Sequence, residues 1–187
     1  MINTIEVWRI RLDRPTAIAP TLAETERANR FATPILRRRY LRAHAALRGI
    51  LQRHTNAPLE FAVHERGKPY LASDSTLHFN LSHSCDLALI AVTRACPVGI
   101  DIERLRPIPD FAAIAQRYFP NGSPIPTTAR DFFRQWTQFE ARLKAQGTGL
   151  FGITEVPGEW SVSQIDAGPR YAAALANEGP ARTVRLR

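Results

Sequence analysis

Hydrophobic and polar residues alternate from Ile5 to Leu12, which is typical of a strand with one buried face. Thr21 and Glu24 have the spacing of a capping box and predict a short helix after Thr21. A longer helix is predicted from Thr33-Pro34, a capping residue followed by a proline at the first helical position, to about His54. Its apolar stripe follows steps of four and three residues: Leu36, Tyr40, Ala43, Leu47 and Ile50.

The next segments have the pattern of short strands: Phe61–His64, Tyr70–Leu71, Leu77–Leu81 and Leu87–Thr93. The last of these is apolar on both faces and therefore predicts a central strand that is covered on both sides. A strand at Val98–Glu103, helices at Phe111–Phe119 and at about Ala129–Gln146, and two or three strands between Trp160 and Arg187 complete the prediction. Helices and strands are mixed without strict βαβ alternation, which predicts an α+β fold.

Composition narrows the class of protein. The chain has 187 residues, 44% of them hydrophobic, which excludes a disordered protein and fits one large domain or two small ones. We expect no signal peptide and no membrane span, because no apolar run approaches about 20 residues. Cys85 and Cys96 form no CxxC pair, so we expect reduced thiols and a cytoplasmic location. The net charge of +8 suggests an anionic partner: a nucleic acid, a phosphorylated cofactor, an acidic protein or a membrane surface.

Asp101 and Glu103 are the most informative polar pair. In an extended Val98–Glu103 both side chains point to one side, while Ile100 and Ile102 face the core. Two carboxylates about 7 Å apart along one face repel each other unless a cation lies between them. Such hard oxygen ligands suit Mg²⁺ bound to substrate phosphates. A strand with a solvated acidic face is the alternative that this pair alone leaves open.

The long helix contributes a second polar pair. Its predicted core stripe consists of Phe132, Trp136, Phe139 and Leu143. Glu140 and Lys144 are i, i+4 neighbours on the adjoining face and could form an ordinary surface pair. The functional alternative is a third metal carboxylate beside a cation for phosphate oxygens.

Ser82 and His83 lie in a third polar segment, just before the buried strand. The chain has no GxSxG elbow, and adjacent Ser and His residues do not reach attack geometry, so a hydrolase is disfavoured. A zinc site is disfavoured as well, because the available residues have no familiar ligand spacing: His78, His83, Cys85 and Cys96. A hydroxyl and an imidazole at a strand end could instead bind phosphate oxygens.

Three segments, taken in order, resemble the motifs of the 4′-phosphopantetheinyl transferases. They are Asn80-Leu81-Ser82-His83-Ser84, Val98-Gly99-Ile100-Asp101-Ile102-Glu103 and Trp136-Thr137-x-x-Glu140-Ala141-x-x-Lys144. Gly67-Lys68-Pro69 and Gly147-x-Gly149-Leu150 are similar to that family as well. The resemblance extends from about Phe31 to Phe151 and is to the larger, monomeric type that activates polyketide and nonribosomal peptide synthetases.

The resemblance implies two similar α+β halves related by a pseudo-twofold axis, residues 1–97 and 98–187, with coenzyme A in the cleft between them. It implies that Asp101, Glu103 and Glu140 hold Mg²⁺, with Mn²⁺ as the alternative ion. Glu140 would act as the general base, with Lys144 and Asp101 completing the catalytic group. The implied cofactor contacts are Gly67, Lys68, Pro69, Ser82, His83 and Lys144.

Two positions depart from the family pattern. Phe139 stands where a lysine usually precedes the helix glutamate, and Ala45 stands where an arginine commonly contacts the coenzyme A 3′-phosphate. Arg42 or Arg48, one helical turn to either side, is our candidate to replace that arginine. These departures leave open a relative that binds coenzyme A or a carrier protein with weak or lost transferase activity.

The expected reaction moves the phosphopantetheine arm of coenzyme A to a serine of an apo acyl or peptidyl carrier protein and releases 3′,5′-ADP. The positive charge suits the anionic co-substrate and an acidic carrier. We expect a monomer that binds neither a membrane nor nucleic acid. An arginine-rich helix could in principle bind nucleic acid, but no basic–aromatic ladder or recognition motif accompanies its arginines: Arg37, Arg38, Arg39, Arg42, Arg48 and Arg53.

Overall fold

The computed structural model describes residues 3–120, 122–148 and 158–187. It has an α+β fold, as the sequence predicts. In chain order the elements are β1 (Thr4–Arg11), α1 (Leu22–Ala28), α2 (Pro34–Leu51), β2 (Phe61–Val63), β3 (Pro69–Leu71), β4 (His78–Ser84), β5 (Leu87–Thr93), β6 (Val98–Arg104), α3 (Phe111–Tyr118), α4 (Ala129–Gln146), β7 (Trp160–Gln164), β8 (Tyr171–Glu178) and β9 (Thr183–Leu186).

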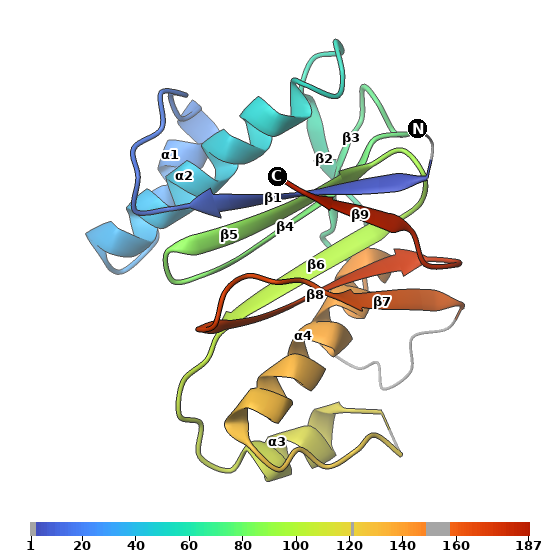
Figure 1. The fold of residues 1–187 in the computed structure, drawn as a ribbon. Coiled ribbons are helices and arrows are strands. Elements are labelled where there is room, and N and C mark those ends of the chain that lie inside the picture. The colour runs from blue at the N-terminus through green and yellow to red at the C-terminus, as the bar shows by residue number, and fades with distance from the viewer. Residues whose placement is uncertain (1–2, 121, 149–157) are drawn as a thin grey trace.

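Two sheets form the centre of the molecule (Figure 1). The first has the strand order β4-β5-β1-β9, in which β1 is antiparallel to β5 and parallel to β9. The second has the order β6-β8-β7 and is antiparallel throughout. The strands β2 and β3 form a separate hairpin. A strand near the C-terminus therefore lies in the same sheet as the first strand of the chain.

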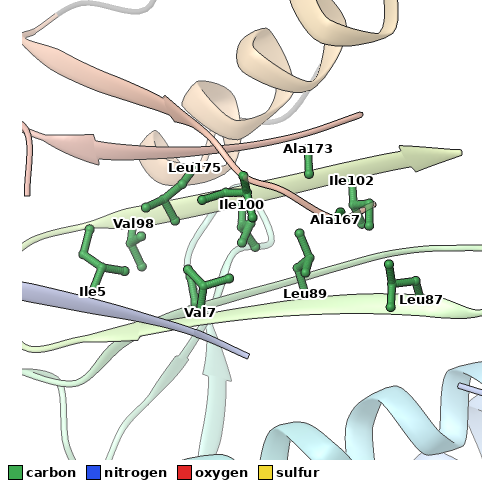
Figure 2. Close-up of a cluster of buried hydrophobic side chains, with 12 residues drawn as sticks. Ile5, Val7, Leu87, Leu89, Val98, Ile100, Ile102, Ala167, Ala173 and Leu175 are labelled. Carbon is green, nitrogen blue, oxygen red and sulfur yellow. The ribbon is translucent and has the colours of Figure 1, made fainter. Parts of the chain in front are cut away.

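An apolar core lies between the two sheets (Figure 2). Ile5 and Val7 of β1 and Leu89 of β5 meet Ile100 of β6 and Leu175 of β8 in this core. Every residue of β5 is buried, which confirms the prediction of a central strand covered on both faces. The outer face of the first sheet packs against α2, and the outer face of the second packs against α4. The order of layers is thus helix, sheet, sheet, helix.

Local sequence signals account for the helices. Thr21 and Glu24 form the predicted capping box, Thr33 caps α2, and Gly147 ends α4 in a left-handed conformation with φ of 79°. The helix α4 has the predicted boundaries. Leu36 was expected on the buried stripe of α2 and is 41% exposed, because the residues of α2 that pack on the sheet lie toward its other end.

The strand β4 is longer than predicted. It continues to Ser84, three residues beyond the expected end at Leu81, and then turns at Cys85 and Asp86 into β5. The division into halves at residue 97 stays a prediction. The second sheet begins with β6 at Val98, but β9 pairs with β1 in the first sheet.

None of the helices in the described parts of the chain combines the length and the apolar character needed to cross a membrane. Both cysteines are free thiols, with Cys96 buried and Cys85 partly buried.

Candidate active site

The strand β6 presents its polar residues to α4. Ile100 and Ile102 belong to the core between the sheets, so Asp101 and Glu103 point to the opposite face, as the alternation predicts. The helix comes very close to this face at Gly99. A Cβ atom at Gly99 would lie 2.2 Å from the main-chain oxygen of Ala141 and from the main-chain nitrogen of Ala145. A glycine is therefore required where the helix crosses the strand.

Asp101 is held in a buried ion pair. Its side chain has a residue exposure of only 4%, and its Oδ1 lies 2.5 Å from Lys144 Nζ. Ser82 Oγ donates a hydrogen bond of 2.8 Å to the same oxygen. The other oxygen, Oδ2, is buried and has no hydrogen-bond partner. An unpaired buried carboxylate oxygen is costly, so this atom is a candidate ligand position.

Glu103 lies two residues along the strand and is more accessible. Its Oε2 accepts a hydrogen bond of 3.0 Å from Ser84 Oγ and one of 3.2 Å from Arg106 Nη1. The arginine is largely exposed, and screening by water makes such a pair weak. Glu103 is therefore oriented on its inner side by a hydroxyl and is open to solvent on its outer side.

Glu140 brings a third carboxylate to the same place. Burial raises the pKa of Glu140 to about 7, opposed by the positive charge of Lys144 and reinforced by the carboxylates of Asp101 and Glu103. The three acidic groups are thus close enough to influence one another's ionisation. A carboxylate with a pKa near neutrality suits proton transfer at physiological pH.

These donors fit a divalent cation in their chemistry. Asp101 Oδ2 lacks a partner, and the mutual repulsion that helps to raise the pKa of Glu140 is what a bound cation would relieve. Within residues 3–120, 122–148 and 158–187, however, no three Asp, Glu, His or Cys side chains are already arranged around a common metal position. Lys144 supplies the positive charge beside Asp101 in this arrangement.

The strands β4 and β6 lie alongside each other, but no main-chain ladder joins these two fully described strands. Side chains of β4 accept the hydrogen bonds instead. Ile100 N donates to Asn80 Oδ1 at 2.8 Å, Ile102 N to Ser82 Oγ at 3.4 Å, and Arg104 N to Ser84 Oγ at 3.0 Å. We call this row of hydrogen bonds the polar seam. It consists of the side chains of Asn80, Ser82 and Ser84 and the main-chain amides of Ile100, Ile102 and Arg104. The last two of these side chains lie beyond Leu81, in the part of β4 that also pairs with β5.

Ser82 and His83 were both predicted to contact phosphate, and the strand points them in opposite directions. Ser82 faces β6, whereas His83 follows Leu81 on the side toward α2. His83 is exposed. Partial desolvation and the positive charges of His44, Lys144 and Arg39 lower the pKa of His83. A contact of His83 with phosphate stays a prediction.

Lys68 lies between three elements. Its Nζ donates to the main-chain oxygens of Val98 at 3.1 Å and of Ala145 at 2.6 Å, which ties the β2–β3 hairpin to the start of β6 and the end of α4. Burial lowers the pKa of Lys68 to about 8. Its ammonium group is therefore occupied by carbonyl oxygens in this structure, and its contact with coenzyme A stays a prediction.

Arg42 and Arg48 are also occupied. Arg42 Nη1 donates to Leu12 O at 2.7 Å, and Arg48 forms a nearly buried ion pair with Glu24 of α1. The first contact holds the end of β1 against α2, and the second holds α1 against α2. A role for either arginine in phosphate binding stays a prediction, as it does for Gly67 and Pro69.

A cavity of about 880 Å³ opens at the C-terminal end of α4. Lys68 and Pro69 of the hairpin line one side, and residues 145–148, directly after Lys144, line another. Trp160 and Glu178 contribute from the second sheet. Gly149 and Leu150, which resemble the family motif, lie outside the described residues.

Both departures from the family pattern are buried. Phe139 is 2% exposed and packs against Phe119 with ring centres 6.1 Å apart, which confirms its predicted place in the core. Ala45 is 1% exposed on the inner side of α2. An apolar side chain at each position is therefore consistent with local packing.

Sequence reasoning missed Ser84 and Asn80 as parts of the site. The signal was present, since the polar residues Asn80, Ser82 and Ser84 stand at every second position. That alternation indicated only a polar strand face, because a pattern within one strand does not reveal the strand that it meets.

The sequence is similar to known proteins. A sequence model described as the 4′-phosphopantetheinyl transferase superfamily matches residues 97–185, which include β6 and α4. The chain is 39% identical to the 4′-phosphopantetheinyl transferase HetI of a Nostoc species, over 95% of this chain and 89% of that protein. It is 37% identical to psf-1 of Bacillus pumilus, over 68% and 58% of the two chains. It is 29% identical to Sfp of Bacillus subtilis, over 78% and 72%.

These relatives identify the chain as a transferase, and its architecture is α+β. The chain belongs to the 4′-phosphopantetheinyl transferase superfamily.

Proposed function

We propose that this chain transfers the 4′-phosphopantetheine arm of coenzyme A to a serine hydroxyl of an apo carrier protein. The observation that carries the proposal is the meeting of Asp101, Glu103, Glu140 and Lys144 between β6 and α4, in a chain of this superfamily. In the reaction the serine oxygen forms a bond to the β-phosphorus of coenzyme A. The bond from that phosphorus to the bridging oxygen breaks, and 3′,5′-ADP leaves with the electron pair.

Each residue of the cluster has a role that follows from its surroundings. Glu140 has a pKa near 7, so a large fraction is ionised at neutral pH and can accept the proton of the attacking serine. Lys144 lies at the mouth of the cluster with a side chain 31% exposed, where its charge can face phosphate oxygens. Asp101 holds that ammonium group in place.

Asp101, Glu103 and Glu140 are the residues that would hold Mg²⁺, or Mn²⁺ in its place. The ion would neutralise phosphate charge during the displacement. In the present arrangement Lys144 balances the charge of Asp101, so we infer that the carboxylates adjust when an ion and coenzyme A bind together. Coenzyme A would extend from this cluster toward the basic residues and the cavity at the end of α4.

The direct test is intact-mass spectrometry of apo carrier proteins incubated with this protein, coenzyme A and Mg²⁺. The panel contains a fatty-acid acyl carrier and a peptidyl carrier, because the physiological carrier is not specified by the site. We expect a mass gain of one phosphopantetheine that is lost with E140Q and in EDTA. The matched control is E26Q, which changes an exposed glutamate of α1 and should retain full activity.

A different result would favour the second candidate. If coenzyme A binds but no carrier gains mass, a binding relative without transfer activity becomes the better description, and the buried Phe139 and Ala45 become the residues to revert. A monomeric state and a cytoplasmic location are further parts of the proposal. Sedimentation of the purified chain tests the first of these.

A further inference from the structure

The polar seam repeats one hydrogen-bond pattern twice. Ser82 Oγ donates to Asp101 Oδ1 at 2.8 Å and accepts from Ile102 N at 3.4 Å. Ser84 Oγ donates to Glu103 Oε2 and accepts from Arg104 N, both at 3.0 Å. Each serine hydroxyl therefore donates a hydrogen bond to one carboxylate and accepts one from the main-chain amide of the next residue.

The hydroxyl groups have little capacity left for a ligand. A serine hydroxyl has one hydrogen to donate and two lone pairs that accept. Ser82 donates to Asp101 and accepts from Ile102 N and, at 3.1 Å, from Lys144 Nζ, so all of its capacity is used. Ser84 uses its only hydrogen on Glu103. Neither hydroxyl has a hydrogen free for a phosphate oxygen.

Asn80 shows what the seam needs where no carboxylate is present. It accepts from Ile100 N through Oδ1, and the residue before Ile100 is Gly99, which has no side chain. A carboxamide oxygen is sufficient there, because only an acceptor is required. At the next two positions a carboxylate precedes the amide, and the side chain must donate as well as accept. Serine meets that requirement with its single Oγ atom.

We propose that Ser82 and Ser84 are positioning residues that orient the carboxylates of Asp101 and Glu103 for the divalent cation. The proposal rests on the proposed function for the identity of the site. In this proposal the Ser82 hydroxyl contacts Asp101 instead of coenzyme A, and the Ser84 hydroxyl contacts Glu103 in the same way. A hydrogen bond to one oxygen of each carboxylate fixes its rotation and leaves the second oxygen available to an ion.

The first experiment measures binding of Mn²⁺ to the purified protein by titration calorimetry, without coenzyme A or carrier. Outer hydrogen-bond partners of metal ligands typically change metal affinity by about 10- to 100-fold. We expect the dissociation constant to rise about 10-fold in S84A and by a similar factor in S82A. S84T retains the hydroxyl at a partly exposed position and should restore most of the affinity. The matched control is S161A, because Ser161 Oγ donates only to Gly179 O, in the other half of the second sheet.

A second measurement separates positioning from a purely structural role. Amide hydrogen exchange at Arg104 should accelerate in S84A, because its acceptor is lost under either interpretation. If exchange accelerates but Mn²⁺ affinity and the Mg²⁺ concentration for half-maximal transfer stay unchanged, the serines only join the strands and the proposal is wrong. If both constants rise while kcat at saturating Mg²⁺ changes little, the proposal is supported.

The outcomes for the wild-type protein distinguish this inference from the proposed function. Mn²⁺ binding that depends on Ser84, without transfer to any carrier, would contradict the transferase and retain the positioning role. Transfer by the wild type with no effect of S84A or S82A on metal affinity would retain the transferase and contradict the positioning role.

Discussion

The two edges of β4 are joined to their neighbours in different ways. On one edge a continuous antiparallel ladder pairs His78–Ser84 with the fully buried strand β5. On the other edge, in the polar seam, main-chain amides of β6 donate to side chains of β4 instead of to its main-chain oxygens. The main-chain ladder is independent of residue type, whereas the seam depends on three particular side chains. The second arrangement brings polar atoms between two sheets, and the candidate site lies at that boundary.

This difference shows that the two edges of β4 have different roles. One edge stabilises the sheet, and the other orients residues of the candidate site. The edge toward β5 is stabilised by apolar burial and by hydrogen bonds that most substitutions leave intact. The edge toward β6 tolerates fewer substitutions, because it depends on serine hydroxyl groups that also contact Asp101 and Glu103. Substitutions at the seam should therefore alter both strand pairing and the site.

The largest effect is expected when β6 is pushed away from α4. G99A should destabilise the protein by about 3 kcal/mol or more, because the new methyl group would meet main-chain atoms of Ala141 and Ala145 that cannot move independently. The free energy of unfolding is measured in urea by circular dichroism. The control is G49A in α2, whose Cβ meets only the end of the Ile18 side chain. Removing a helical glycine there should be neutral or stabilising by about 1 kcal/mol. Equal effects of G99A and G49A would contradict the close approach.

An intermediate loss is expected when the seam loses an acceptor. N80L keeps the size of the side chain but leaves the buried Ile100 N–H without a partner, which costs about 2 kcal/mol. Hydrogen exchange should accelerate at Ile100 and stay slow at Ile90, which lies in the main-chain ladder between β4 and β5. Uniform acceleration at both amides would show that the two edges of β4 are not independent.

The third prediction concerns the charge that the site carries. The pKa of Glu140 is raised from 4.5 to about 7, so its carboxyl group stabilises the folded state below about pH 4.5 and that stabilisation is lost as the pH rises through 7. E140Q removes the buried charge and should therefore be more stable than wild type at pH 8, by about 1–2 kcal/mol after allowance for screening.

The measurement is thermal unfolding at pH 5 and pH 8 in EDTA. The melting temperature of E140Q should exceed that of wild type by several degrees at pH 8 and by much less at pH 5. E26Q, at an exposed position, should show no such pH-dependent difference. A gain that is the same at both pH values would mean that the pKa of Glu140 is not raised.

The smallest effect is expected for a polar contact at the surface. Arg11 and Asp13 form a well-shaped ion pair, with 2.6 Å between Nη2 and Oδ2, but both side chains are about half exposed to solvent. R11A should leave the melting temperature unchanged within the error of the measurement. A loss comparable to that of N80L would contradict the view that burial gives the seam its importance.

Much of this molecule could be predicted from local patterns. Thr21, Thr33 and Gly147 mark helix ends through hydrogen bonds to nearby residues, so their signals are complete within a few positions. The alternation around Asp101 likewise shows which side chains share a face. The acidic cluster was predictable because these residues also match an ordered family motif.

The remaining features depend on contacts between distant segments. The end of β4 was placed too early because Ser82 and Ser84 are polar, and their partners lie in β6. Lys68 was expected to contact coenzyme A, which stays a prediction, but its bonds to the carbonyl oxygens of Val98 and Ala145 were not foreseen. No pattern within the β2–β3 hairpin indicates that the start of β6 and the end of α4 lie beside it.

The pairing of β9 with β1 has a consequence for how the protein is made. Arg187 N donates to Val7 O and Arg9 N donates to Arg187 O, so within the described residues the edge of β1 opposite β5 pairs with residues 183–187. During synthesis, β1 leaves the ribosome before β9. Until then that edge of β1 is open to pairing with other chains. We therefore expect slow translation between β5 and β9 to favour aggregation of this protein.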